Sequence, residues 1–194
     1  MSEPLITFLQ HLQPVSPEDA ELITSYFESN IFEEGDYLFR SGHIIREMFF
    51  ICKGVLRIMV NNEKGIEVTH FFLKENQFCT ILNSFNNEIP AQESIRAACK
   101  TEVLSIGKNR LHDLYKQLPW LQVLIGRITQ QHLIDKIALR NTYLGLDSTE
   151  RYKLFLAQQP EIALRVPLSD IASYLGITPQ SLSRIRKNIR YPAS

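Results

Sequence analysis

The spacing of apolar side chains changes twice along this 194-residue chain, and the two changes limit the folds that it can adopt. Residues 4–30 carry apolar side chains at helical spacing, residues 30–107 alternate with a period of two, and residues from 108 onward return to the helical period. Within the first segment, Ser16 followed by Pro17 has the pattern of a helix N-cap. We therefore predict an α+β chain whose antiparallel β-domain lies between short N-terminal helices and a helical C-terminal part.

Short runs of aromatic and β-branched residues fill the middle segment. The runs cover residues 37–39, 48–52, 55–60 and 68–73. Turn signals lie between them, at Gly35-Asp36, Ser41-Gly42, Lys53-Gly54 and residues 61–65. Short strands at intervals of roughly 7 to 12 residues are typical of an antiparallel β-roll of the jelly-roll type.

The composition is that of an ordinary globular protein, with 44% hydrophobic and 22% charged residues. No apolar run approaches the ~20 residues of a membrane span, and the acidic start does not resemble a secretory signal, so we expect a cytoplasmic protein without a membrane partner. Cys52, Cys79 and Cys99 are odd in number and widely separated, and the sequence holds no C-x-x-C pair or Cys/His cluster, so neither a disulfide framework nor a zinc site is supported. We therefore expect reduced cysteines and no cofactor.

Charge is distributed unevenly, although the chain is neutral overall. The first 36 residues hold eight Asp or Glu and no Lys or Arg. The last eleven hold no acid but four bases, Arg184, Arg186, Lys187 and Arg190. A basic end on a neutral protein is expected when one small element meets phosphate groups. On charge alone, the solvated face of a frayed C-terminal helix is an equal alternative.

A long helix is predicted to begin at Pro119 and to run to about Tyr143. Its apolar residues form two groups at the spacing of a coiled-coil seam, separated by a stutter. We predict that this seam pairs with a second copy of the chain through Leu121, Ile125, Ile128, Leu133, Ile137 and Leu144. The alternative is an ordinary helix packed on its own β-domain.

Residues 168–187 have the pattern of two short helices joined by a tight turn. Gly176 supplies the left-handed residue that ends the first helix, while Thr178 and Pro179 suit the N-cap and first position of the second. Ala172 is small where the helices cross. The predicted shared interior consists of Ile171, Leu175, Leu182 and Ile185. The pattern predicts a helix-turn-helix, with a helical hairpin that has no DNA role as the alternative.

This packing directs polar side chains outward from the second helix, namely Gln180, Ser181, Ser183, Arg184 and Lys187. In a major groove, arginine pairs with guanine and glutamine with adenine. The hydroxyls of Ser169, Thr178 and Ser181 suit phosphate contacts near the helix N-termini. We therefore predict that this segment binds double-stranded DNA.

With the β-roll, the long helix and this motif in that order, the chain resembles the cyclic-AMP receptor protein/Fnr (Crp/Fnr) family of bacterial transcription regulators. The resemblance covers essentially the whole chain and rests on residues 35–42, 50–57 and 147–151 together with the C-terminal motif. It implies three parts: a β-roll domain of the cyclic-nucleotide-binding type at 1–115, a dimerisation helix at 116–145 and a helix-turn-helix domain at 146–194.

The resemblance further implies a homodimer on a two-fold symmetric operator, with half-sites about one helical turn (~34 Å) apart. The family's base-reading positions correspond to Pro179, Gln180 and Arg184, and only Arg184 keeps the arginine of the cyclic-AMP-responsive members. We therefore expect a different operator sequence. With little sequence after Arg190, few phosphate contacts from a β-hairpin wing are expected. Activation through RNA polymerase is commoner in this family than repression.

The ligand cassette of the cyclic-nucleotide-binding members is altered at the matching positions. Cys79-Thr80 stands in place of Gly-Glu, and Glu93 stands where an arginine neutralises the cyclic phosphate, which a carboxylate would repel. Arg96 lies near enough in sequence to substitute if it shares that strand face. Lys136 replaces a hydroxyl that contacts adenine. We predict no cyclic-AMP binding by this remnant pocket, whose residues are Cys79, Thr80, Glu93, Ser94, Arg96 and Lys136.

Other sensing modes and functions find less support. The cysteine cluster that holds an iron–sulfur centre in Fnr-like members is absent, and Cys79 is a redox candidate against the simpler alternative of packing. His70, His112 and His132 form no cluster, whereas a metal-dependent barrel enzyme needs a His-x-His…Glu set, so we expect no enzyme. An alternative from a different functional class is a small-molecule-binding roll whose helical tail contacts proteins and not DNA. The salt dependence of binding separates the two, because binding led by phosphate contacts weakens steeply as salt rises. The sequence does not decide whether a small-molecule effector binds or which molecule it is.

Overall fold

The structure, a computed structural model, describes residues 3–190. Its strands are β1 (Glu28–Phe32), β2 (Tyr37–Phe39), β3 (Glu47–Lys53), β4 (Leu56–Asn61), β5 (Glu67–Leu73), β6 (Phe78–Cys79), β7 (Glu93–Ala97) and β8 (Thr101–Gly107). Its helices are α1 (Glu3–Leu12), α2 (Pro17–Tyr26), α3 (Leu82–Asn87), α4 (Lys108–Gln117), α5 (Pro119–Thr142), α6 (Ser148–Gln158), α7 (Pro160–Arg165), α8 (Leu168–Leu175) and α9 (Pro179–Arg190). This order confirms the α+β fold predicted from the changing apolar period.

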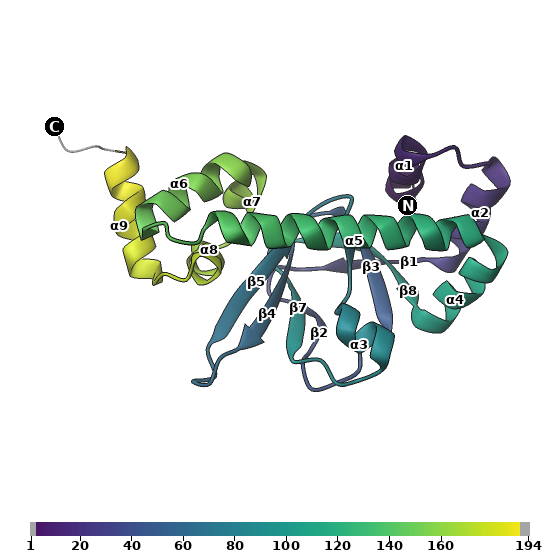
Figure 1. Cartoon of the computed structure of the whole chain (residues 1–194), viewed down its shortest axis with the longest axis horizontal. Coiled ribbons are helices and arrows are strands. Elements are labelled where there is room, and N and C mark those ends of the chain that lie inside the picture. The colour runs from purple at the N-terminus through teal and green to yellow at the C-terminus, as the bar shows by residue number, and fades with distance from the viewer. Residues whose placement is uncertain (1–2, 191–194) are drawn as a thin grey trace.

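The strands form two four-stranded antiparallel sheets (Figure 1). One sheet has the order β1-β8-β3-β6 and the other has the order β2-β7-β4-β5. β4 pairs with β5 on one side and with β7 on the other, so β5 lies at the edge of its sheet. An edge strand presents backbone N–H and C=O groups that another element can bind. The predicted antiparallel β-roll is confirmed, and β5 has an open edge.

The apolar core of the roll draws on both sheets and on the N-terminal helices. Phe50 of β3, Leu56 of β4 and Ile95 of β7 are fully buried in one cluster. Leu9 of α1 and Leu114 of α4 belong to the same cluster. Because burial of apolar surface contributes about 25 cal/mol per Å², this shared cluster fixes the helices to the sheets.

α5 runs along the roll and leads to the C-terminal helices (Figure 1). Its first half belongs to the roll's own core, with Leu121, Ile125 and Ile128 only 0%, 3% and 9% exposed. The predicted dimer seam is therefore wrong for these three residues, because the same chain already buries them. The apolar residues of the seam that stay exposed are Leu133, Ile137 and Leu144.

Local capping determines where several helices begin. Ser16 Oγ accepts a hydrogen bond from Asp19 N at 3.1 Å, as the N-cap pattern predicts. A capping box of Asp147 and Glu150 begins α6. α5 begins at Pro119, inside the 116–145 range predicted for the long helix. Within residues 3–190, no helix combines the length and the hydropathy that a membrane crossing requires.

The C-terminal helices pack on one end of the roll. Phe155 of α6 and Ile171 of α8 share a buried cluster with Val55 and Phe72 of the β-domain. The ring of Phe72 lies 6.4 Å from that of Phe155 and 5.2 Å from that of Tyr174. The C-terminal part is thus joined to the roll by a continuous apolar contact as well as by α5.

Candidate functional site

α8 and α9 form the helix-turn-helix that residues 168–187 predict. Gly176, with φ 68°, ends α8 in the left-handed conformation. Thr178 Oγ1 accepts a hydrogen bond from Ser181 N at 3.1 Å, and Pro179 is the first residue of α9. The interior of the motif is built from Ile171, Ala172, Leu175 and Leu182, all buried, and from half-buried Ile185. Both caps and the interior agree with the sequence pattern.

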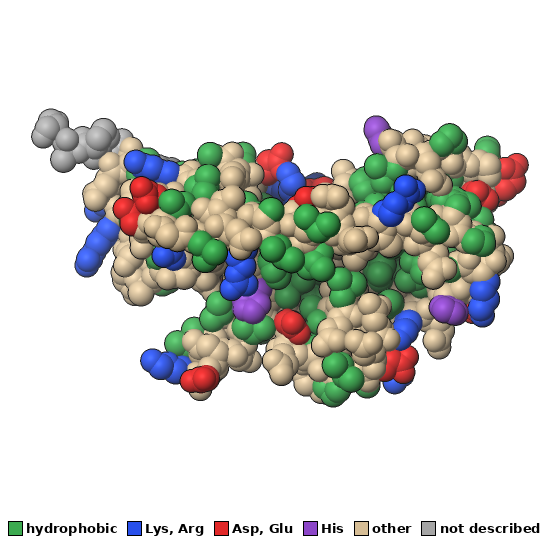
Figure 2. All heavy atoms as spheres, in the orientation of Figure 1, with side chains coloured by type: hydrophobic (Ala, Val, Ile, Leu, Met, Phe, Trp, Pro, Cys, Tyr) green, Lys and Arg blue, Asp and Glu red, His purple; other side chains and the backbone are tan. Residues whose placement is uncertain are grey.

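The outer side of α9 carries a polar surface that we call the reading face, defined as Gln180, Ser181, Ser183, Arg184 and Lys187. All five side chains are exposed. The Ser181 hydroxyl hydrogen-bonds to that of Thr178, whereas no described residue pairs with the side chain of Gln180, Arg184 or Lys187. Figure 2 shows Lys and Arg side chains at this end of the molecule. The structure therefore brings the side chains predicted to point outward together on one accessible helix face.

The residues predicted to contact phosphate lie in two places. Thr178 and Pro179 are exposed at the start of α9, beside the reading face. Ser169 lies on α8, where its hydroxyl is 3.5 Å from Asp170 Oδ1. Sequence analysis also missed Arg151 of α6, whose Nη1 donates to the carbonyl of Leu175 at 3.0 Å. That bond ties α6 to the end of α8 and so helps to fix the turn.

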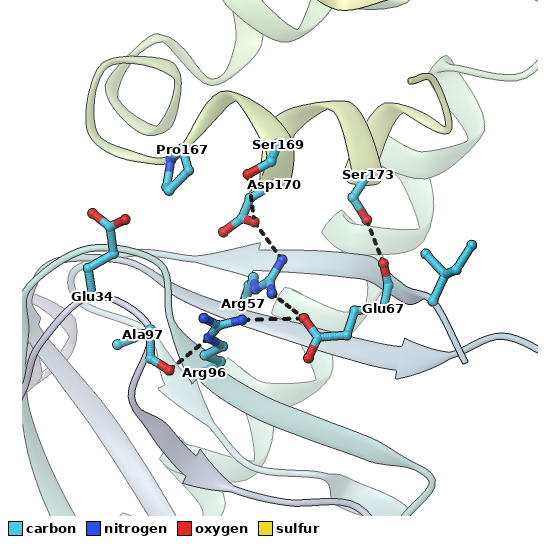
Figure 3. Close-up of a pocket in the computed structure, with 11 residues that line it drawn as sticks. Glu34, Arg57, Glu67, Arg96, Ala97, Pro167, Ser169, Asp170 and Ser173 are labelled. Atoms are coloured by element: carbon cyan, nitrogen blue, oxygen red, sulfur yellow. Dashed lines mark hydrogen bonds and ion pairs between the residues drawn. The ribbon is translucent and has the colours of Figure 1, made fainter. Parts of the chain in front are cut away.

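A hollow of about 500 Å³ lies between the roll and α8 (Figure 3). Arg57 of β4 is 4% exposed and reaches across it. Its Nη1 donates to Asp170 Oδ1 and its Nη2 donates to Glu67 Oε2, each at 2.7 Å. Ser173 of α8 bonds to the backbone of β5, where its Oγ accepts from Thr69 N at 2.9 Å. The sequence did not predict this junction, although Arg57 is the one charged residue of β4.

Charges in the junction compensate one another. Burial alone would raise the pKa of Glu67, but the Tyr37 hydroxyl at 2.5 Å and the guanidiniums of Arg57 and Arg96 hold it below its usual range. Burial raises the pKa of Asp170, and the charge of Arg57 opposes that shift. Arg57 is therefore the shared counter-ion of one carboxylate from the roll and one from the helix-turn-helix.

Three residues of the remnant pocket, Cys79, Thr80 and Ser94, are buried or hydrogen-bonded within the roll. Cys79 is buried, and burial raises the pKa of its thiol to about 12, which disfavours the reactive thiolate and favours the packing role. Thr80 Oγ1 donates to the carbonyl of Glu47 at 2.9 Å. Ser94 Oγ accepts from Ser41 N, also at 2.9 Å. These polar groups stabilise loops of the roll.

Arg96 is engaged at the junction between the roll and α8. β7 pairs with β4 so that Arg96 lies opposite Arg57, and its Nε donates to the carbonyl of Gly35 at 2.8 Å. It therefore faces the junction with α8, which corrects its predicted place in the pocket. Glu93 lies at the start of β7. The Lys136 ammonium lies 5.4 Å from the centre of an aromatic ring of β5.

The three histidines considered in the sequence differ in their exposure. His112 is exposed, whereas His70 and His132 are partly buried. Burial lowers the pKa of His132, and the charge of Lys136 adds to this effect. No group of three His, Cys, Asp or Glu side chains within residues 3–190 is placed to hold a metal ion.

Comparisons with known proteins agree with this arrangement. The cyclic nucleotide-binding domain family matches residues 30–118. The transcriptional activator protein Anr of Pseudomonas aeruginosa is 25% identical over 166 residues, which cover 79% of this chain and 66% of Anr. The cAMP-activated global transcriptional regulator Vfr of the same organism is 24% identical over 166 residues, which cover 77% of this chain and 76% of Vfr. The chain thus spans just under two thirds of the length of Anr.

Solved structures show the same fold. The c-di-GMP responsive global regulator CLP of Xanthomonas campestris superposes with a TM-score of 0.71 at 16% identity, with 90% of this chain and 92% of that chain covered. Residues 30–118 thus match the cyclic nucleotide-binding domain family, and most of the chain is similar to the transcription regulators Anr and Vfr.

Proposed function

We propose that this protein is a cytoplasmic transcription regulator, not an enzyme, that binds double-stranded DNA sequence-specifically as a homodimer. The observation that carries the proposal is the reading face, a row of exposed polar side chains on a capped and well-packed helix. Arg184 suits guanine and Gln180 suits adenine in a major groove. Lys187, Thr178 and Ser181 suit phosphate oxygens, which position a protein on the duplex.

Exposed apolar side chains along α5 support the dimer. Beyond Leu133 and Ile137, two further apolar residues of this helix are exposed, Val123 (60%) and Ile134 (51%), and Leu144 is exposed just after the helix ends. Val123 and Ile137 are separated by a multiple of seven, which places them on one side of α5 in a two-stranded coiled coil, and Leu144 continues this spacing just after the helix ends. We propose that two copies of α5 pair along this side, which corrects the seam predicted from the sequence.

We further propose that DNA binding does not require cyclic AMP. The polar groups of Thr80 and Ser94 are engaged within the roll, Arg96 is engaged at the junction, and Glu93 takes the place of the family's phosphate-binding arginine. A carboxylate at that position disfavours a cyclic phosphate. Titration calorimetry with cyclic AMP should therefore show no saturable heat, whereas binding at micromolar concentration contradicts this part of the proposal.

Selection of bound sequences from a random duplex library, using the purified chain and no ligand, tests the DNA-binding proposal. We expect a two-fold symmetric motif whose half-sites are about 10 base pairs apart. Affinity for the selected duplex should fall steeply as salt rises, because phosphate contacts release counter-ions. A library that stays unenriched, with and without cyclic nucleotides, contradicts the proposal and favours a roll whose helical tail contacts proteins.

RNA polymerase is the partner that we propose for the DNA-bound dimer. Transcription in vitro from a promoter that carries the selected motif should rise when the chain is added. The matched control is the same promoter with both half-sites scrambled, which should not respond. A fall in transcription from the intact promoter instead identifies a repressor.

A further inference from the structure

The junction between the roll and α8 contains a buried ion pair that links the two parts of the chain. Arg57 of β4 donates to Asp170 of α8 and to Glu67 of β5, both at 2.7 Å (Figure 3). The side chain of Arg57 is 4% exposed and that of Asp170 is 15% exposed. A guanidinium that loses its partner at such a depth is strongly unfavourable. The ion pair therefore favours the state in which α8 stays on the roll.

A second polar contact acts beside the ion pair. Ser173, almost one helical turn after Asp170, accepts a hydrogen bond from Thr69 N at 2.9 Å and donates to the carbonyl of Glu67 at 3.2 Å. β5 is the edge strand of its sheet, so the Ser173 hydroxyl satisfies backbone groups that no strand covers. Both contacts specify position and direction, which the apolar cluster around Phe72 does not do by itself.

The docked side of the helix-turn-helix is distinct from its reading face. Asp170 and Ser173 face the roll from α8, whereas the reading face belongs to α9 and is exposed. In Figure 1, α9 lies at the end of the molecule, beyond α8 and away from the sheets. Docking therefore leaves the reading face accessible while it fixes the direction in which α9 points.

We infer that Arg57, Glu67, Asp170 and Ser173 form an interdomain latch that holds α9 in the orientation required for an operator. This inference rests on the proposed DNA-binding function. Both reading faces of a dimer must meet their half-sites at one fixed spacing, so any freedom between roll and helix-turn-helix reduces the fraction of competent molecules. Asp170 and Ser173 are positioning residues, since they act on DNA only through α9.

The first test of the latch needs no DNA. Hydrogen exchange of the full chain should show a protected Thr69 amide, because Ser173 covers it. The variants Asp170→Asn and Ser173→Ala should each speed this exchange about tenfold or more, while amides in the core of the roll keep their rates. Asp113→Asn is the matched control, because it removes a carboxylate from an exposed surface pair with Lys116. Unchanged exchange at Thr69 in both variants overturns the inference.

The second test measures dissociation constants for a selected full operator and for a duplex with one half-site. Asp170→Asn should weaken operator binding about tenfold and leave half-site binding within about twofold, because the reading face is intact. Asp170→Glu restores the carboxylate and should recover part of the affinity. Equal loss on both duplexes, or tighter operator binding, overturns the inference. A wild-type chain that selects no sequence contradicts the proposed function instead, and the exchange measurement still decides the latch.

Discussion

The two helices of the helix-turn-helix place their polar side chains in opposite situations. On α8, Asp170 is paired with Arg57, and Ser173 is bonded to the backbone of β5. On α9, Gln180 and Arg184 are exposed and have no partner among the described residues. Polar groups with partners inside the chain stabilise one arrangement of its parts. Polar groups without partners are available to another molecule.

The two halves of α5 differ in the same way, with apolar in place of polar side chains. Ile128 is 9% exposed and belongs to the core of the roll, whereas Ile137, nine residues later, is 52% exposed. Both residues fit a helical seam equally well in the sequence. The difference separates residues that hold the monomer together from residues that we propose to hold the dimer together.

The largest expected effect is on the two isoleucines of α5. Ile128→Glu buries a charge in the core and should lower the free energy of unfolding by more than about 4 kcal/mol. Ile137→Glu should leave the fold of each chain intact and convert dimers to monomers. Urea unfolding and analytical ultracentrifugation measure the two outcomes, with Gln131→Ala as an exposed control on α5. Dimers that survive Ile137→Glu place the interface elsewhere.

Arg57→Ala is expected to have the next largest effect. It leaves Asp170 and Glu67 without their shared counter-ion, so the free energy of unfolding should fall by about 3 kcal/mol. Urea unfolding followed by circular dichroism measures this loss. Arg184→Ala, a similar truncation on the reading face, should change stability by less than about 0.5 kcal/mol and is the matched control. Similar stabilities for both variants contradict the contrast between α8 and α9.

For DNA binding we expect the opposite emphasis, because Arg184→Ala removes a DNA contact although it hardly changes the free energy of unfolding. Arg184→Ala should weaken binding to the cognate operator by about 1–3 kcal/mol and relax base preference at one position of each half-site. Competition binding with operators mutated base by base measures both effects. Lys187→Ala should instead weaken binding to all sequences alike. If Arg184→Ala leaves specific binding unchanged, our orientation of α9 in the groove is wrong.

The smallest expected effect is on pH dependence. Burial, aided by Lys136, keeps the pKa of His132 below its usual 6.5 in the folded chain. The unfolded chain therefore binds the proton more readily, and stability should decrease as pH falls from about 7 through this range. His132→Gln should give a shallower decrease in thermal unfolding scans, with exposed His112→Gln as the control. Equal slopes for both variants show that His132 contributes nothing measurable.

Much of this protein was predictable from neighbouring residues. The cap at Ser16, the left-handed Gly176, the N-cap Thr178 and the alternation of the strands each depend on a few adjacent positions. Such signals survive folding because helix ends and tight turns have strong local requirements. For the same reason the reading face was found, since the interior of the helix-turn-helix determines which side of α9 points outward.

The sequence by itself therefore determined the elements, their order and the helix-turn-helix. Only the tertiary structure decided which side chains of these elements meet. Arg57 and Asp170 are 113 positions apart, and no local pattern links them. Arg96 was assigned to the wrong surface because its direction depends on the pairing of β7 with β4. The buried and exposed halves of α5 are alike in period, and they differ only because the roll covers one and not the other.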